Sequence, residues 1–144
     1  AFLRGVDGIE NDLLRQDTNL VNLYFSVTKE DQARRFKRRV SDPHRQWKLS
    51  EVDVQAQEHW DDFTEKKYDM LRRTSTAAAP WTIIRSGSKP KARLNAMKVI
   101  LNAVPYEGRD PDMDFVPDPE IVISGAQEIS LMEAERIRKG HFTT

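Results

Sequence analysis

The sequence predicts an α/β protein, in which parallel strands are covered by helices. Two short apolar runs, residues 20–27 and 81–84, predict strands, and the first has the aliphatic and aromatic composition of a strand that is buried on both faces. A long helical stretch separates the two runs, and another helix follows the second. Strands that alternate with helices are typical of a parallel sheet with right-handed crossovers. Because two strands do not make a stable sheet, we expect the others to come from chain outside this sequence or from a partner subunit.

Helical patterns flank the first strand. Residues 1–19 place apolar side chains at helical spacing and end in a turn. Thr28 is the expected N-cap of a second helix, which ends near Val40, before an Asp-Pro pair. Ser50 is the expected N-cap of a third, which reaches about Arg73.

The second strand leads into one more helix. Residues 74–80 are a loop rich in small side chains, and Ser88 caps a helix that ends at Pro105. Apolar residues at helical spacing predict the buried stripe of this helix: Leu94, Met97, Leu101 and Val104.

Composition divides the chain into residues 1–105 and an acidic C-terminal tail, residues 106–144. The tail is proline-marked at first, so we expect it to be extended. Residues 121–123 predict a short edge strand, and residues 130–139 predict a short amphipathic helix.

Composition also excludes several classes of function. The chain has no cysteine, which excludes disulfides and thiolate metal sites and fits a reducing, cytoplasmic compartment. It has no apolar run near the roughly 20 residues of a membrane span. The formal net charge is zero, so no global charge favours a nucleic acid. The start, residues 1–4, has neither an initiator Met nor a signal-peptide layout and reads like a cut inside a longer chain.

Charge is distributed unevenly along the chain. Residues 34–48 hold seven basic residues and one acid, and residues 85–98 hold five basic residues and no acid. Residues 106–120 hold six acids and one base. Two basic segments beside an acidic one suit local phosphate binding better than long-range steering.

The first basic segment is the sharpest chemical signal. Arg35 and Arg39 lie one helical turn apart, and two adjacent guanidinium groups suit phosphate oxygens. After a proline-marked turn, Arg45 and Lys48 bring more positive charge back to the same region. The alternative is an ordinary solvated helix face.

Other residues give weaker signals. Trp47 and Trp60 could stack on bases, although Trp60 lies on an apolar stripe typical of a core. Asp61 and Asp62 could hold Mg²⁺, but acids on a charged helix more often pair with nearby bases. The histidines lack ligand spacing, so we predict no metal site within this chain. The motif G-x-x-x-x-G-K-[ST] of the phosphate-binding loop is also missing.

A string of segments resembles the polyphosphate kinase 2 family, in the family's order and over about residues 2–108. The segments are DQARRFKRRVSDPHRQWKLSEVD (31–53), WDDFTEKKYDML (60–71), APWTII (79–84), KARLNAM (91–97) and VPYEG (104–108). The resemblance implies a P-loop kinase fold, of which this chain is the C-terminal half, bearing a helical lid over about residues 28–76. Family members move a phosphoryl group between inorganic polyphosphate and a nucleoside mono- or diphosphate, with Mg²⁺. We expect that Mg²⁺ to be bound mainly by residues outside this chain, and we expect a homo-oligomer.

The resemblance also implies roles for individual residues. Arg35 and Arg39 match the lid arginines and are the expected catalytic pair. Positive charges that support them on phosphate are expected at Arg34, Arg45 and Lys48. The segment A-R-L-N implies nucleotide-binding roles for Arg93 and Asn95.

The chain departs from the family pattern in two places. The phosphate loop is missing, so we expect this chain alone to be inactive. Residues 87–90 read Gly-Ser-Lys-Pro where family members often have Asp-Asp-Lys-Lys. Two other functions remain open: a non-catalytic relative that binds polyphosphate or nucleotide, and an interaction fragment that completes a sheet in an oligomer. Because acids near the phosphates would repel substrate, we expect the tail either to cross to another subunit or to pack along the surface of its own domain, away from the phosphates.

Overall fold

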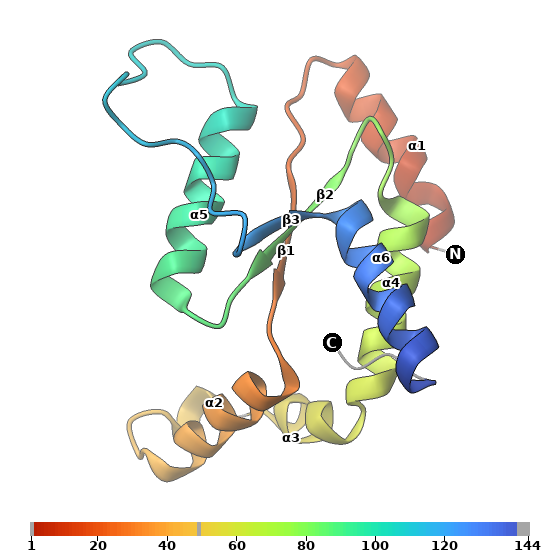
Figure 1. Cartoon of the computed structure of the whole chain (residues 1–144), viewed down its shortest axis with the longest axis vertical. Helices are drawn as coiled ribbons and strands as arrows, with labels where there is room; N and C mark the ends of the chain where they lie inside the picture. The colour runs from red at the N-terminus through yellow and green to blue at the C-terminus, as the bar shows by residue number, and fades with distance from the viewer. Residues whose placement is uncertain (1, 49, 141–144) are drawn as a thin grey trace.

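The computed structural model describes residues 2–48 and 50–140, and it places a three-stranded sheet between two layers of helices (Figure 1). The elements are α1 (Phe2–Arg15), β1 (Asn22–Ser26), α2 (Lys29–Ser41), the 3₁₀ turn η1 (Gln46–Lys48), α3 (Glu51–Glu58), α4 (Trp60–Thr74), β2 (Trp81–Arg85), α5 (Lys89–Ala103), β3 (Val122–Ser124) and α6 (Gly125–Lys139). The predicted α/β class is confirmed.

The sheet has the order β1-β2-β3. Strands β1 and β2 are parallel, with Asn22 opposite Trp81, as the two apolar runs predict. The expected edge strand is also present, but β3 runs antiparallel to β2, so the sheet is mixed. The chain enters β3 beside the carboxyl end of β2, since Val122 pairs with Ile84, and this entry point sets the direction. Among the described residues, no strand pairs with the other edge of β1.

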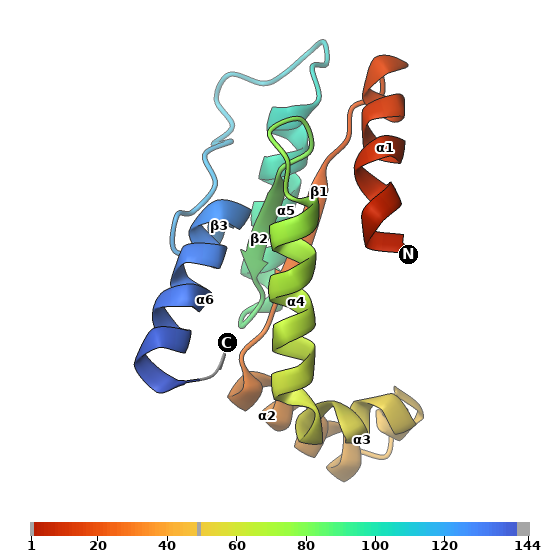
Figure 2. The same cartoon turned by 90° about the vertical axis from the view of Figure 1, so that its right-hand side faces the viewer.

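The helices cover the sheet unequally. Helices α1, α4 and α6 lie on one face and α5 lies on the other, as the two perpendicular views show (Figures 1 and 2). Neighbouring residues of β2 point to opposite faces, so Ile83 packs with Leu71 of α4 while Ile84 packs with Ala92 and Ala96 of α5. Both isoleucines are fully buried, which explains the continuous apolar run of this strand.

The buried stripe of α5 differs from the prediction. The helix turns Ala92, Asn95 and Ala96 toward the sheet, whereas Leu94 and Met97 are more than half exposed. Apolar residues surround much of this helix, so their spacing alone does not select one face. The two small alanines allow the helix to approach the sheet closely, and this packing decides the face.

The long helix predicted from Ser50 to about Arg73 is two helices. Helix α3 ends at Glu58, and α4 begins after His59, which has φ −99° and ψ 23°. The predicted cap at Thr28 is present, because its hydroxyl accepts a hydrogen bond of 3.1 Å from the backbone N–H of Asp31.

The C-terminal tail is extended only in its first part. Residues 122–139 form β3 and a 15-residue helix, α6, which is longer than the predicted 130–139. Ser124 caps this helix by accepting from the N–H of Gln127, and Met132 is 1% exposed beside α4. Because it is capped and has a buried face, α6 forms part of the core of the domain. No helix in the described ranges is long and apolar enough to cross a membrane.

Candidate functional site

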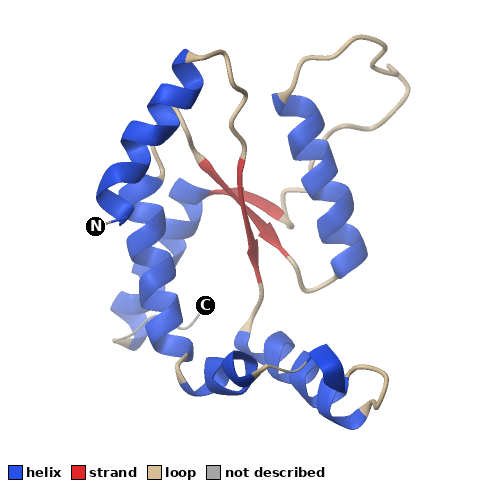
Figure 3. Cartoon of the chain, turned by 180° about the vertical axis from the view of Figure 1, so that it is seen from behind, coloured by secondary structure: helices blue, strands red, loops and turns tan. Residues whose placement is uncertain are grey.

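The helical excursion α2–η1–α3 begins directly at the carboxyl end of β1 and projects beyond the sheet (Figure 3). In α/β sheets, ligands bind outside the carboxyl ends of parallel strands. Both basic segments reach this edge, because α2 follows β1 and α5 follows β2. The fold therefore brings together charges that lie about 50 residues apart in sequence.

Arg35 joins the two basic segments. Its guanidinium group donates to the backbone carbonyl of Ser86, and to that of Gly87 at 3.3 Å. Both carbonyls belong to the loop between β2 and α5. The side chain is thus held at the start of α5, where the dipole and the free N–H groups of a helix favour anions.

Lys89, in the first turn of α5, is exposed and lies within reach of four other positive charges. Slight burial lowers the pKa of Lys89, and the positive charges of its neighbours Arg35, Arg39, Arg93 and Lys48 lower it further. These five residues are called the cation cluster below. The structure thus brings together three of the predicted lid cations and Arg93. Sequence reasoning placed Lys89 in a basic segment but did not select it as a site residue.

Two of the predicted phosphate-binding residues have local acidic partners. Arg34 forms an ion pair with Asp31, and the Nε of Arg45 lies 2.6 Å from a carboxylate oxygen of Asp42. In each pair the two partners lie three positions apart in the sequence. Neither arginine is among the charges that act on Lys89. Their roles in phosphate binding stay predictions.

Asn95 is buried, with 4% of its surface exposed, and its amide is bonded at both ends. Its NH₂ group donates to the carbonyl of Lys91, and its oxygen accepts 2.7 Å from the N–H of Asp118. The second bond fastens the end of the acidic segment to α5. A role in nucleotide binding stays a prediction for this residue.

The acidic segment lies along α5, away from the start of that helix. Lys98 donates to Asp114 at 2.6 Å and to the carbonyl of Val116 at 2.9 Å. The hydrogen bond from Lys98, together with the N–H of Val116, holds the pKa of Asp114 below its usual value. In Figure 1 this segment and the excursion lie at opposite ends of the sheet. These residues of the tail pack along their own domain, away from the start of α5, as expected. The expectation is wrong for α6, because Glu128 and Glu135 lie at the carboxyl ends of β1 and β2, where the packing of α6 against α4 holds them.

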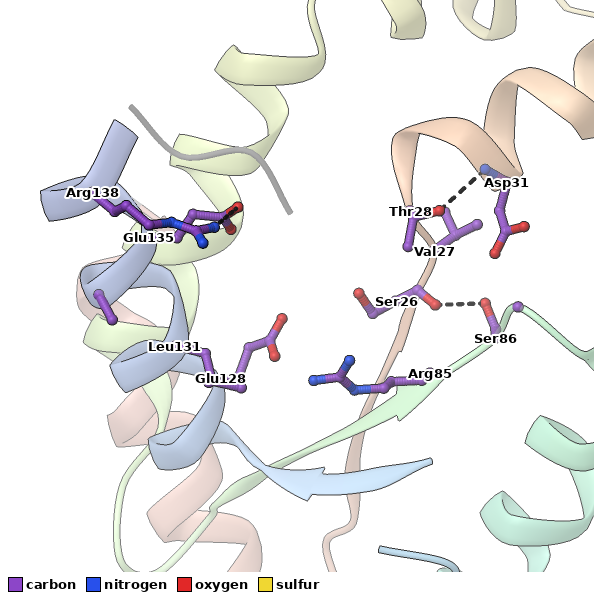
Figure 4. Close-up of a pocket in the computed structure, with 12 residues that line it drawn as sticks. Ser26, Val27, Thr28, Asp31, Arg85, Ser86, Glu128, Leu131, Glu135 and Arg138 are labelled. Atoms are coloured by element: carbon purple, nitrogen blue, oxygen red, sulfur yellow. Dashed lines mark hydrogen bonds and ion pairs between the residues drawn. The ribbon is translucent and has the colours of Figure 1, made fainter. Parts of the chain in front are cut away.

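A cavity of about 580 Å³ opens at the carboxyl ends of β1 and β2 (Figure 4). The strand ends form one wall, and one side of α6, with Glu128, Leu131 and Glu135, forms the other. Arg85 extends into the space between the two walls. Among the described residues, no three histidine or acidic side chains lie close enough together to hold a metal ion.

Comparisons with known proteins agree on one family. The family model described as polyphosphate kinase 2 matches residues 1–111. The chain is 47% identical over 121 residues to NDP-polyphosphate phosphotransferase 2 of Ruegeria pomeroyi, covering 84% of this chain and 35% of the relative. It is 41% identical over 128 residues to polyphosphate kinase PPK2B of Corynebacterium glutamicum, covering 89% and 42%.

A solved structure gives the same result. The crystal structure of polyphosphate kinase 2 from Arthrobacter aurescens TC1 superposes with a TM-score of 0.69 at 25% identity, over 92% of this chain and 45% of that one. The chain thus spans less than half the length of each of these three relatives.

Proposed function

The chain belongs to the polyphosphate kinase 2 family, and we propose that the full-length protein transfers a phosphoryl group between inorganic polyphosphate and a nucleoside mono- or diphosphate. The cation cluster is the observation that carries this proposal. Its members come from the excursion after β1 and from the start of α5, so they approach one ligand from two sides.

Phosphoryl transfer requires positioning and charge neutralisation more than covalent chemistry by the protein. In the proposed mechanism, Arg35 and Arg39 donate to the oxygens of the transferred phosphoryl group. The other members of the cluster, Lys48, Lys89 and Arg93, neutralise the neighbouring phosphates. Arg35 reaches its ligand by exchanging the carbonyls of Ser86 and Gly87 for phosphate oxygens, so the excursion acts as a lid.

The proposed function also needs Mg²⁺ and further strands, which we expect groups outside the described residues to supply. Mg²⁺ would neutralise the β- and γ-phosphate charges, bound mainly by groups that are not in this chain. The open edge of β1 fits completion of the sheet by further chain or by a second subunit, and we propose a homo-oligomer in the cytoplasm.

A non-catalytic binding protein is the second candidate. The 144 residues hold no phosphate-loop motif, and this favours binding without turnover for the chain on its own. The cation cluster needs no such loop to attract a polyanion.

Purified full-length protein distinguishes these functions. With polyphosphate, Mg²⁺ and each nucleoside mono- or diphosphate, we expect the next higher nucleotide to form, measured by chromatography. The 144-residue chain alone should bind polyphosphate and form no product. Binding by the full-length protein without turnover would favour the second candidate, and the absence of both would refute the two functions together.

A further inference from the structure

A buried ion pair joins α6 to α4, and neither of its residues belongs to the cation cluster. Lys67 and Glu128 contact each other, and each is only 6% exposed. Removing two charges from water is costly, and apolar residues of similar volume often stabilise a core at least as well. The pair therefore calls for a role other than adhesion between the two helices. Glu128 also lies beyond residues 1–111, the part that the family model matches.

Lys67 also contacts the first strand. Its ammonium group lies 3.4 Å from the hydroxyl of Ser26 and 5.3 Å from the centre of the Tyr24 ring. Burial raises the pKa of Tyr24, and the nearby charge of Glu128 raises it further. The pair thus contacts the end of β1, where the lid begins.

From Ser26, hydrogen bonds continue to the lid. Its carbonyl accepts from both the N–H and the hydroxyl of Ser86, each at 2.7 Å, and the hydroxyl bond is drawn in Figure 4. The carbonyl of Ser86 in turn accepts from the guanidinium group of Arg35. An unbroken series of contacts therefore links Glu128, through Lys67, to the lid arginine.

We propose that Lys67 and Glu128 are positioning residues, which fix the ends of β1 and β2 and so set the resting position of Arg35 at the start of α5, from which that side chain moves to the phosphate. This inference rests on the proposed function. Displacements of about 1 Å are enough to reduce catalysis about 100-fold when they move a group that acts on the transition state. A buried pair that spans three elements restricts such a displacement.

The test replaces the pair by apolar side chains, Lys67→Met with Glu128→Leu, so that no unpaired charge is left buried. The matched control is a second ion pair between the same helices, Arg72 and Glu133, which are 3.8 Å apart and partly exposed. The control variant is Arg72→Met with Glu133→Leu. Both variants are made in the full-length protein, with and without Arg35→Ala.

We expect the Lys67/Glu128 variant to keep its urea midpoint and to lose about 10-fold in kcat with little change in nucleotide KM. The loss should vanish in the Arg35→Ala background, because the pair acts through that residue. The control should change neither constant. Unchanged kcat in a stable variant, or a loss that is fully additive with Arg35→Ala, would overturn the proposal.

A second measurement does not depend on turnover. In hydrogen exchange of the 144-residue chain, the same variant should expose the amide of Ser86 and those of α2 sooner, while α6 keeps its protection. Faster exchange in α6 instead would show a purely structural pair and would refute the proposal. If the double variant does not fold, Ser86→Ala is used instead, because it removes only the hydroxyl bond to Ser26. This variant should speed the hydrogen exchange of the α2 amides, and unchanged exchange would refute the proposal. If the wild type shows no turnover, the proposed function fails, and exchange alone decides this inference.

Discussion

Replacing Arg35 by alanine tests the proposed site most directly. In the resting structure this side chain makes two hydrogen bonds to loop carbonyls, and in the proposed mechanism it moves to the transferred phosphoryl group. The loss of one preorganised electrostatic donor typically costs about 3–4 kcal/mol of transition-state stabilisation, which is about 100- to 1000-fold in kcat. The lost bonds to the carbonyls should reduce stability by only about 1 kcal/mol.

The assay is the polyphosphate-dependent formation of nucleotide by the full-length protein, with urea unfolding measured in parallel. Arg39→Ala should lose a similar factor. The matched control on the same helix is Arg38→Ala, which points about 100° away from Arg39. Arg35→Lys should lie between wild type and Arg35→Ala, because it keeps the charge without the two-pronged geometry. Equal and small losses at all of these positions would show that α2 presents an ordinary solvated face, and the reasoning would be wrong.

Further predictions concern three residues outside the lid. Bound phosphate should raise the lowered pKa of Lys89, so the 144-residue chain should take up protons when it binds polyphosphate at a pH just below 10.5. Calorimetry in buffers of different ionisation enthalpy measures this uptake, and Lys89→Gln should abolish it. Without ligand, the lowered pKa means that the unfolded chain binds more protons than the folded chain just below pH 10.5, so the contribution of Lys89 to stability rises with pH there. A urea midpoint that stays flat across this pH range in both wild type and Lys89→Gln would contradict this prediction. Asn95→Ala should destabilise the fold by about 1 kcal/mol, since a partly buried N–H of the tail loses its acceptor; a raised nucleotide KM at full stability would instead support its predicted nucleotide contact. Gly125→Ala should cost about 1–3 kcal/mol in thermal unfolding, because a Cβ there would lie 3.0 Å from the Cβ of Trp81, whereas Gly5→Ala, with nothing within 4 Å, should show no such loss.

Local signals in the sequence predicted most of the elements. The hydroxyl of Thr28, the two apolar runs and the proline after Ser88 act within a few residues, and each produced the expected cap, strand or helix start. Packing decided the rest. The face of α5 depends on which side chains let the helix approach the sheet, and spacing alone gave the wrong one.

The candidate site was predictable only in part. The resemblance selected Arg35 and Arg39 because they fall in one short motif. It did not select Lys89, whose importance comes from neighbours on another element. Nor could the contact of Arg35 with Ser86, 51 residues away, be read from the sequence, because it depends on how the two strand ends meet.

The outer edge of β1, with which no strand in the described part of the chain pairs, has a practical consequence for anyone who handles the 144-residue chain. The strand NLYFS carries no charge and no proline, and Phe25 is 51% exposed. Edge strands that lack such protective residues template the addition of other chains. Samples should therefore self-associate as concentration rises, with growing thioflavin fluorescence and light scattering. A charged residue at the edge, as in Phe25→Lys, should keep them dispersed.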